Sequence, residues 1–157
     1  MFIDLNKNTT YALGEYKDNG AAIDAAFLYQ DNNGGALLCS SDAPAIREVA
    51  YYNFQTTIDA LLGASVRNTT KFKKLTGVTY ADITADYVNG LTITSEVLTS
   101  VGTLKGNGVA VAKNDLVAFE TADGTKGVLN ITAYSATAKT LANITFDYKV
   151  QKTGSAK

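Results

Sequence analysis

The chain has 157 residues, a net charge of -1, no histidine and a single cysteine. This length suits one domain with a substantial core, and the near-neutral charge gives no basic surplus for binding nucleic acid. The missing histidine removes the commonest general base and metal ligand, and one cysteine permits neither a disulfide nor a thiolate zinc site within the chain. We therefore expect no cofactor and no metal centre.

The first fifty residues predict three strands and two short helices. Residues 2–5 form a short apolar edge strand, and residues 10–18 form a helix that a threonine begins. Residues 22–30 alternate but are mostly apolar on both faces, which is typical of a strand in the middle of a sheet. Residues 36–39 form a further short strand, and Pro44 suits the first position of a helix over residues 44–52.

Two features between these elements resemble functional sites but have simpler interpretations. The run Asp31-Asn32-Asn33-Gly34-Gly35 resembles the start of a calcium loop, yet the twelfth position of such a loop is Asp42 instead of glutamate. We therefore expect a plain turn there. Cys39 ends the apolar run Leu37-Leu38-Cys39, where a lone cysteine is typically a small buried hydrophobic residue and not a nucleophile.

The middle of the chain, from residue 55 to residue 114, has the weakest pattern. Residues 80–87 favour a short helix and residues 91–94 favour a strand, whereas residues 67–76 are polar and mixed and predict no element.

The C-terminal third predicts a three-stranded antiparallel meander over residues 115–151. Strands over residues 116–121 and 127–133 flank Asp123-Gly124, which supplies the positive φ that a tight hairpin needs. The last strand, residues 143–151, alternates between apolar and polar side chains, which indicates one buried and one solvated face.

These elements predict an α+β fold, with short helices and a mixed, mostly antiparallel sheet that contains residues 22–30 and the meander. The alternative is an all-β sandwich in which the helices are loops. We expect one globular domain over residues 1–151 and a flexible tail over residues 152–157. The residues predicted to lie in the core are Ile23, Phe27, Tyr29, Phe119, Leu129, Ile131, Ile144, Phe146, Tyr148 and Val150.

The aromatic cluster Tyr51, Tyr52 and Phe54 is the candidate ligand-binding site. Aromatic rings present an apolar face with a polar edge, which suits sugars, but neighbouring residues on a helix point in different directions, so inward packing is the competing interpretation. No catalytic residue is predicted. The carboxylates are scattered along the sequence, and a glycosidase would need two distant ones to meet in one cleft.

Several stretches are similar, in sequence and in order, to one group of proteins. They are residues 13–16, 22–29, 35–44, 67–72, 114–129 and 146–151, and the C-terminal hairpin and final strand account for most of the likeness. Together they resemble uncharacterised surface or periplasmic lipoprotein domains of Bacteroidetes. The resemblance implies export and an N-terminal lipidated cysteine ahead of this sequence, with Met1 in place of the signal and anchor. It assigns no catalytic residue.

Three functions stay open on this basis. The first is a non-catalytic domain of an exported cell-surface lipoprotein, with an adhesion, scaffold or protein-interaction role. The second is a carbohydrate-binding module that uses surface Tyr and Phe side chains. The third is a carboxylate-dependent glycan-active enzyme. The expected partners are a glycan or another surface protein, at the cell surface or in the periplasm, with no nucleic acid and with membrane contact only through a lipid anchor.

Overall fold

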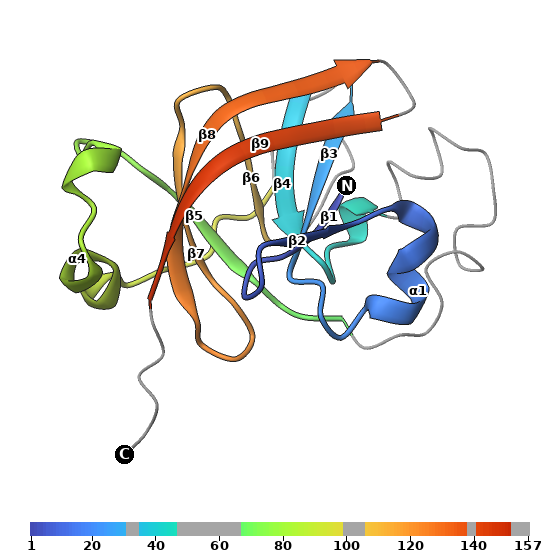
Figure 1. The fold of residues 1–157 in the computed structure, drawn as a ribbon, viewed down its shortest axis with the longest axis horizontal. Coiled ribbons are helices and arrows are strands. Elements are labelled where there is room, and N and C mark those ends of the chain that lie inside the picture. Colours follow the sequence, from blue (N-terminus) through green and yellow to red (C-terminus); the bar gives the residue numbers. More distant parts are fainter. Residues whose placement is uncertain (31–34, 47–66, 99–105, 138–140, 152–157) are drawn as a thin grey trace.

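The computed structural model describes residues 1–30, 35–46, 67–98, 106–137 and 141–151, whose strands form two antiparallel sheets (Figure 1). In spatial order, sheet A contains β2 (Thr9–Tyr11), β1 (Phe2–Asp4), β3 (Ala25–Gln30), β4 (Gly35–Ser40) and β6 (Gly108–Ala110). Sheet B contains β5 (Lys71–Leu75), β7 (Leu116–Glu120), β8 (Lys126–Thr137) and β9 (Leu141–Val150).

The fold is α+β and β-rich, as predicted, and its described helices are all short. They are the 3-10 turns η1 (Leu13–Glu15) and η2 (Tyr80–Asp82) and the helices α1 (Tyr16–Asn19) and α4 (Ala85–Gly90). None of the described helices has the length and apolar character needed to cross a membrane. The predicted β3 strand and the predicted meander lie in different sheets, whereas the sequence suggested a single sheet.

Successive side chains of a strand point to opposite faces of its sheet. The inner faces of the two sheets therefore enclose one core, and apolar residues on the outer faces are buried by other segments. In β3, Ala25 and Phe27 point into the core between the sheets, whereas Ala26 and Leu28 point to the opposite face of sheet A. In β7, Val117 joins the same inner core. The inner core consists of Ile3, Leu5, Ala25, Phe27, Ala36, Leu38, Phe72, Val109, Val111, Val117, Phe119, Leu129, Ile131 and Ile144.

The segments that cover the outer faces are held in different ways. On sheet A, the fully buried Tyr16 of α1 packs with Phe2, and its hydroxyl donates to the Ser41 carbonyl at 2.8 Å. On sheet B, two lysines hold the segment that contains η2 and α4. Lys149 Nζ donates to the carbonyls of Tyr80 and Ile83, and Lys126 Nζ donates to the carbonyl of Leu91.

The predicted helix over residues 10–18 is wrong in its first half. Residues 9–11 form β2 and pair with β1, and Asn8 takes a positive φ of 53° in the turn between them. Helical structure begins only at Leu13, where the Glu15 carboxylate accepts a hydrogen bond from the Ala12 N–H at 2.7 Å. The hairpin satisfies the backbone of β1 on its outer side, and a helix at residue 10 would leave that edge unpaired.

Two predictions in the middle of the chain also differ from the structure. The predicted strand over residues 91–94 is wrong. This segment lies across sheet B, and its Leu91 carbonyl accepts a hydrogen bond from Lys126 Nζ instead of from a neighbouring strand. Residues 71–75 form β5, although the sequence predicted no element there. Exposed lysines flank the fully buried Phe72, so this edge strand places one large apolar side chain in the core.

Some predictions fall on residues outside the described ranges. The predicted turn over residues 31–35 is described only at Gly35, and the helix over residues 44–52 is described, as helical, only over residues 44–46. The aromatic cluster at residues 51, 52 and 54 and the tail over residues 152–157 are outside entirely, so these stay predictions.

The meander is confirmed, and its hairpin places Gly124 at a φ of 85°. On the core side of sheet B, Gly127 pairs with Phe119, and a Cβ on Gly127 would lie 2.4 Å from Cζ of Phe119. The glycine therefore makes room for the fully buried ring. The last strand has the predicted inward face, but Phe146, Tyr148 and Val150 are only partly buried, as is Tyr29. The other six predicted core residues are buried.

Replacing two phenylalanines tests where this core ends. Phe119→Ala removes a fully buried ring and should lower the free energy of unfolding by about 3–5 kcal/mol. Phe146→Ala removes a partly buried ring and should cost less than half as much as Phe119→Ala. Urea denaturation of both variants measures the difference. Equal losses would contradict the position of Phe146 at the margin of the core.

Candidate functional site

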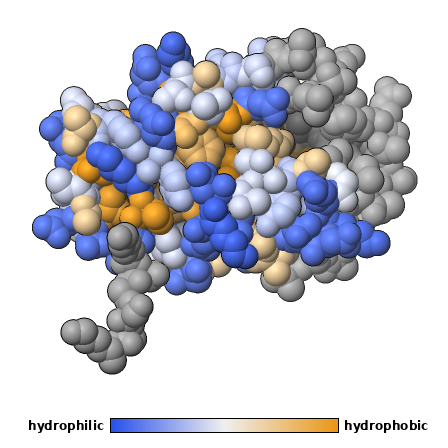
Figure 2. Space-filling model, viewed as in Figure 1, coloured by the Kyte–Doolittle hydropathy of each residue, from blue (hydrophilic) through white to orange (hydrophobic). Residues whose placement is uncertain are grey.

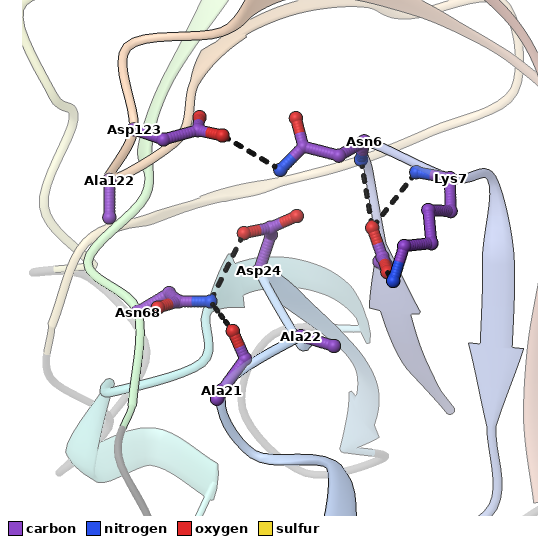
Figure 3. Close-up of a pocket in the computed structure, with 9 residues that line it drawn as sticks. Asn6, Lys7, Ala21, Ala22, Asp24, Asn68, Ala122 and Asp123 are labelled. Carbon is purple, nitrogen blue, oxygen red and sulfur yellow. Dashed lines mark hydrogen bonds and ion pairs between the residues drawn. The ribbon is translucent and has the colours of Figure 1, made fainter.

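A cleft of ≈ 540 Å³ lies where turns from both sheets meet (Figure 3). This volume is in the range of roughly 300–1,000 Å³ that ligand pockets occupy. The β1–β2 turn, the residues just before β3, the approach to β5 and the β7–β8 turn supply its lining. The lining residues are Asp4, Asn6, Lys7, Ala21, Ala22, Asp24, Asn68, Ala122 and Asp123.

Asp4 ends β1 and fixes the shape of the turn that follows it. Its Oδ1 accepts hydrogen bonds from the N–H groups of Asn6 (3.0 Å) and Lys7 (2.9 Å), and its Oδ2 lies 3.8 Å from Lys7 Nζ. An aspartate that binds backbone N–H groups two and three residues ahead stabilises a turn. Asp4 is 2% exposed, so its main role is structural, and it orients Asn6 toward the cleft.

Asp24 lines the cleft and directly precedes Ala25, the first residue of β3. Its Oδ2 accepts a hydrogen bond from the Leu5 N–H at 2.9 Å, and its Oδ1 accepts one from Asn68 Nδ2 at 3.3 Å. The side chain is nevertheless 2% exposed, and in Figure 3 its carboxyl group points between Asp123 and Asn68.

The environment of Asp24 favours its neutral form. Burial raises the pKa of Asp24 to about 6, and the nearby charges of Asp4 and Asp123 add to the rise. The hydrogen bond from the Leu5 N–H stabilises the carboxylate and opposes this shift in pKa, but it is too weak to cancel it. A carboxyl group in this state exchanges its proton near neutral pH.

Asp123 has the opposite character, although it lines the same cleft. Its Oδ1 accepts hydrogen bonds from Thr121 Oγ1 and from the Thr125 N–H (3.1 Å), and its Oδ2 accepts one from Asn6 Nδ2 (3.3 Å). The hydrogen bond from Thr121 is the main reason that the pKa of Asp123 lies below its ordinary value. Asp123 is therefore an exposed, ionised acceptor held by its own hairpin turn.

Asn68 joins the two sheets at the cleft. Its Nδ2 group donates to the carbonyls of Ala21 (2.9 Å) and Ile23 (3.1 Å) as well as to Asp24. The backbone carbonyl of Asn68 accepts a hydrogen bond from Ser40 Oγ, and Ser40 Oγ accepts one from the Thr70 N–H at 2.8 Å. The segment that leads into β5 of sheet B is thus fastened to the end of β4 in sheet A.

The site offers hydrogen-bonding groups to a ligand. The amides of Asn6 and Asn68 combine donors with acceptors, the carboxylates accept, and Lys7 donates. Among the described residues, no three acidic or cysteine side chains are placed to hold a metal ion. Cys39 is fully buried, and burial raises the pKa of its thiol to about 12, which confirms its interpretation as a core residue.

The residues that line the cleft lie where the sequence gave little signal. Three of the carboxylates that are scattered along the sequence form one group, because Asp4, Asp24 and Asp123 lie at three turns that the fold brings together. Of these, only the Asp123-Gly124 turn was predictable. An aspartate at the end of an apolar segment, as at Asp4, and one inside an apolar strand pattern, as at Asp24, are the signals that point to buried carboxyl groups.

Comparison with family models, with curated proteins and with solved structures found no match for this chain. The interpretation of the cleft therefore rests on its own geometry.

The raised pKa of Asp24 predicts how stability depends on pH. Below about pH 3.8 both the folded and the unfolded chain hold the proton, whereas between 3.8 and 6 only the folded chain holds it. The free energy of unfolding should therefore fall by about 3 kcal/mol on account of Asp24 as the pH rises through this window. Asp24→Asn removes the titrating group and should abolish this part of the slope.

Denaturation of the wild-type chain and the variant at a series of pH values measures the effect. The asparagine amide adds a constant offset, because it faces Asn68, so the informative quantity is the change with pH of the difference between the two proteins. A difference that stays constant between pH 4 and pH 7 would show that Asp24 has an ordinary pKa.

Proposed function

We propose that this chain is a non-catalytic domain of an exported cell-surface protein, in which it acts in adhesion by holding a glycan in the cleft. The observation that supports this function is the set of fixed hydrogen-bonding groups around the cleft. A sugar hydroxyl both donates and accepts hydrogen bonds, so neighbouring amides, carboxylates and an ammonium group are suitable partners for it.

The contacts of the carboxylates favour binding over catalysis. Asp4, Asp24 and Asp123 each accept a backbone N–H, from Asn6 and Lys7, from Leu5 and from Thr125 respectively. These bonds hold the acceptors in place before a ligand arrives, which lowers the entropic cost of binding. Each bond also takes up one lone pair of the oxygen that accepts it, which makes that oxygen less available as a nucleophile.

The cleft differs from the aromatic site that the sequence suggested. Its lining contains no aromatic side chain among the described residues, so recognition there depends on hydrogen bonds and not on ring stacking. Tyr51, Tyr52 and Phe54 remain a separate candidate for the same class of ligand, and the two sites make different predictions for mutants.

A panel of host and plant oligosaccharides tests the proposal by thermal shift, followed by calorimetry. A ligand at a hundredfold excess over its Kd adds about 2.7 kcal/mol to stability, which should raise the Tm by several degrees. Asn6→Ala removes an exposed amide from the rim of the cleft and should weaken binding about tenfold. Asn19→Ala is the control, because Asn19 is a half-buried asparagine of α1 that does not line the cleft, and it should leave the affinity unchanged.

The aromatic candidate is tested in the same assay. If Tyr51→Ala, Tyr52→Ala or Phe54→Ala abolishes binding while Asn6→Ala has no effect, the ligand binds at the aromatic cluster and the assignment of the cleft is wrong. Absence of a shift across the whole panel would contradict glycan adhesion and favour a scaffold role with a protein partner.

A carboxylate-dependent glycan-active enzyme is the second candidate, and one observation favours it. Asp24 and Asp123 line one cleft with pKa values displaced in opposite directions, as an acid and an ionised partner require. The binding proposal predicts no release of reducing ends from any ligand of the panel. Release that is lost in both Asp24→Asn and Asp123→Asn would establish the enzyme instead.

A further inference from the structure

Among the strands that the structure describes, none pairs with the second edge of β9. This strand is the last strand of sheet B in the described part of the chain, where β8 pairs with its other edge, and it is 10 residues long. A long, regular edge presents unpaired N–H and C=O groups to which a further strand can add.

The register with β8 identifies the backbone groups that face this open edge. The Gln151 N–H donates to the Lys126 carbonyl at 2.8 Å. In an antiparallel strand, the backbone N–H and C=O groups of alternate residues point to the same neighbouring strand. The backbone groups of residues 147, 149 and 151 therefore point to β8, and those of Phe146, Tyr148 and Val150 point to the open edge. None of these three N–H groups donates to another residue in the described ranges outside the strand ladder.

The side chains of the same three residues lie at the margin of the inner core. Phe146, Tyr148 and Val150 pack against it but stay partly exposed, and Phe146 meets Tyr148 edge to face with ring centroids 6.5 Å apart. Figure 2 shows apolar surface beside the point where the chain leaves β9. An added strand would cover this margin and satisfy the backbone at the same time.

We propose that β9 of a second copy of this chain occupies the edge, antiparallel, with the two strands centred on Tyr148. In this register Tyr148 exchanges both backbone hydrogen bonds with its counterpart, and Phe146 lies opposite Val150. On the outer face of sheet B, beside the η2 segment that Lys149 holds, Asp147 lies opposite Lys149 of the second copy, and the symmetry of the pair repeats this contact. Such directly opposite residues have Cβ atoms about 4.5–5.5 Å apart, close enough for an ion pair.

Charge selects this register over its neighbours. A pair centred on Asp147 or on Lys149 places like charges opposite each other, and a pair centred on Phe146 places Asp147 opposite the uncharged Thr145. Lys149 Nζ gives two hydrogen bonds to carbonyls of its own chain and lies 4.5 Å from the centroid of the Tyr80 ring. Asp147 of the second copy would therefore pair with a lysine that its own chain already holds in place.

A disulfide reports the register directly. Tyr148→Cys places two thiols at a hydrogen-bonded pair, where Cα atoms lie about 5.5 Å apart, within the range of roughly 4.4–6.8 Å that disulfides span. The native Cys39 is fully buried and does not compete. Under mild oxidation this variant should form a covalent dimer. Thr145→Cys, an exposed control, places its thiols six residues apart along the pair, about 20 Å, and should stay monomeric.

Sedimentation at increasing protein concentration tests the same contact without a cysteine. The full chain should shift from monomer to dimer, and Asp147→Lys should raise the dimer Kd at least tenfold. Asp18→Lys makes the same change of charge on the exposed surface of α1 and should leave the Kd unchanged. A chain that stays monomeric at millimolar concentration, or a disulfide that forms as readily at residue 145 as at residue 148, would overturn the proposal.

Discussion

The cleft depends on the buried carboxyl group of Asp24 and the side-chain amide of Asn68, which together connect the two sheets. Asp24 binds the Leu5 N–H at the end of β1, and Asn68 binds Asp24 and two carbonyls before β3. Burying a carboxylate is costly unless hydrogen bonds replace its lost hydration, and here they do so only in part. The raised pKa of Asp24 reflects mainly the loss of hydration that these bonds do not offset. The site is thus held in shape at some cost to stability, as is common at binding sites.

The sequence predicted the parts of the fold that local patterns control. The two apolar faces of residues 25–28 indicated a strand with neighbours on both sides, and β3 does lie between β1 and β4. The alternation of β9 and the Asp123-Gly124 turn predicted the meander. In contrast, β5 shows no alternation of apolar and polar residues that would predict a strand, because Phe72 is its only fully buried side chain. The division into two sheets depends on long-range packing, which local periodicity does not record.

The site was harder to predict for a related reason. Its carboxyl groups are separated by up to 119 positions between Asp4 and Asp123, and each belongs to a different turn. Only the fold brings them together. Each aspartate also has a local structural role, which makes its sequence context resemble that of an ordinary turn. The aromatic residues at 51, 52 and 54 stood out because they are close together in the sequence. The residues that line the cleft are far apart in the sequence and gave no such signal.

The cleft and the edge of β9 are separate surfaces, because no residue of β9 lines the cleft. Pairing through β9 would give one assembly two clefts, and a polymeric glycan that engages both would bind more tightly than to either alone. An adhesion domain gains from this arrangement, since each single contact with a sugar is weak.

The most direct measurement is an NMR titration of the isotopically labelled chain with oligosaccharides, in which the side-chain amide signals are followed. The amides of Asn6 and Asn68 lie in the cleft, whereas the Asn19 amide is bonded to the Glu15 carbonyl on α1 and serves as an internal reference. Binding in the cleft predicts that the signals of Asn6 and Asn68 move and saturate together while that of Asn19 stays fixed. Saturable shifts elsewhere that leave both cleft amides unmoved would contradict this account.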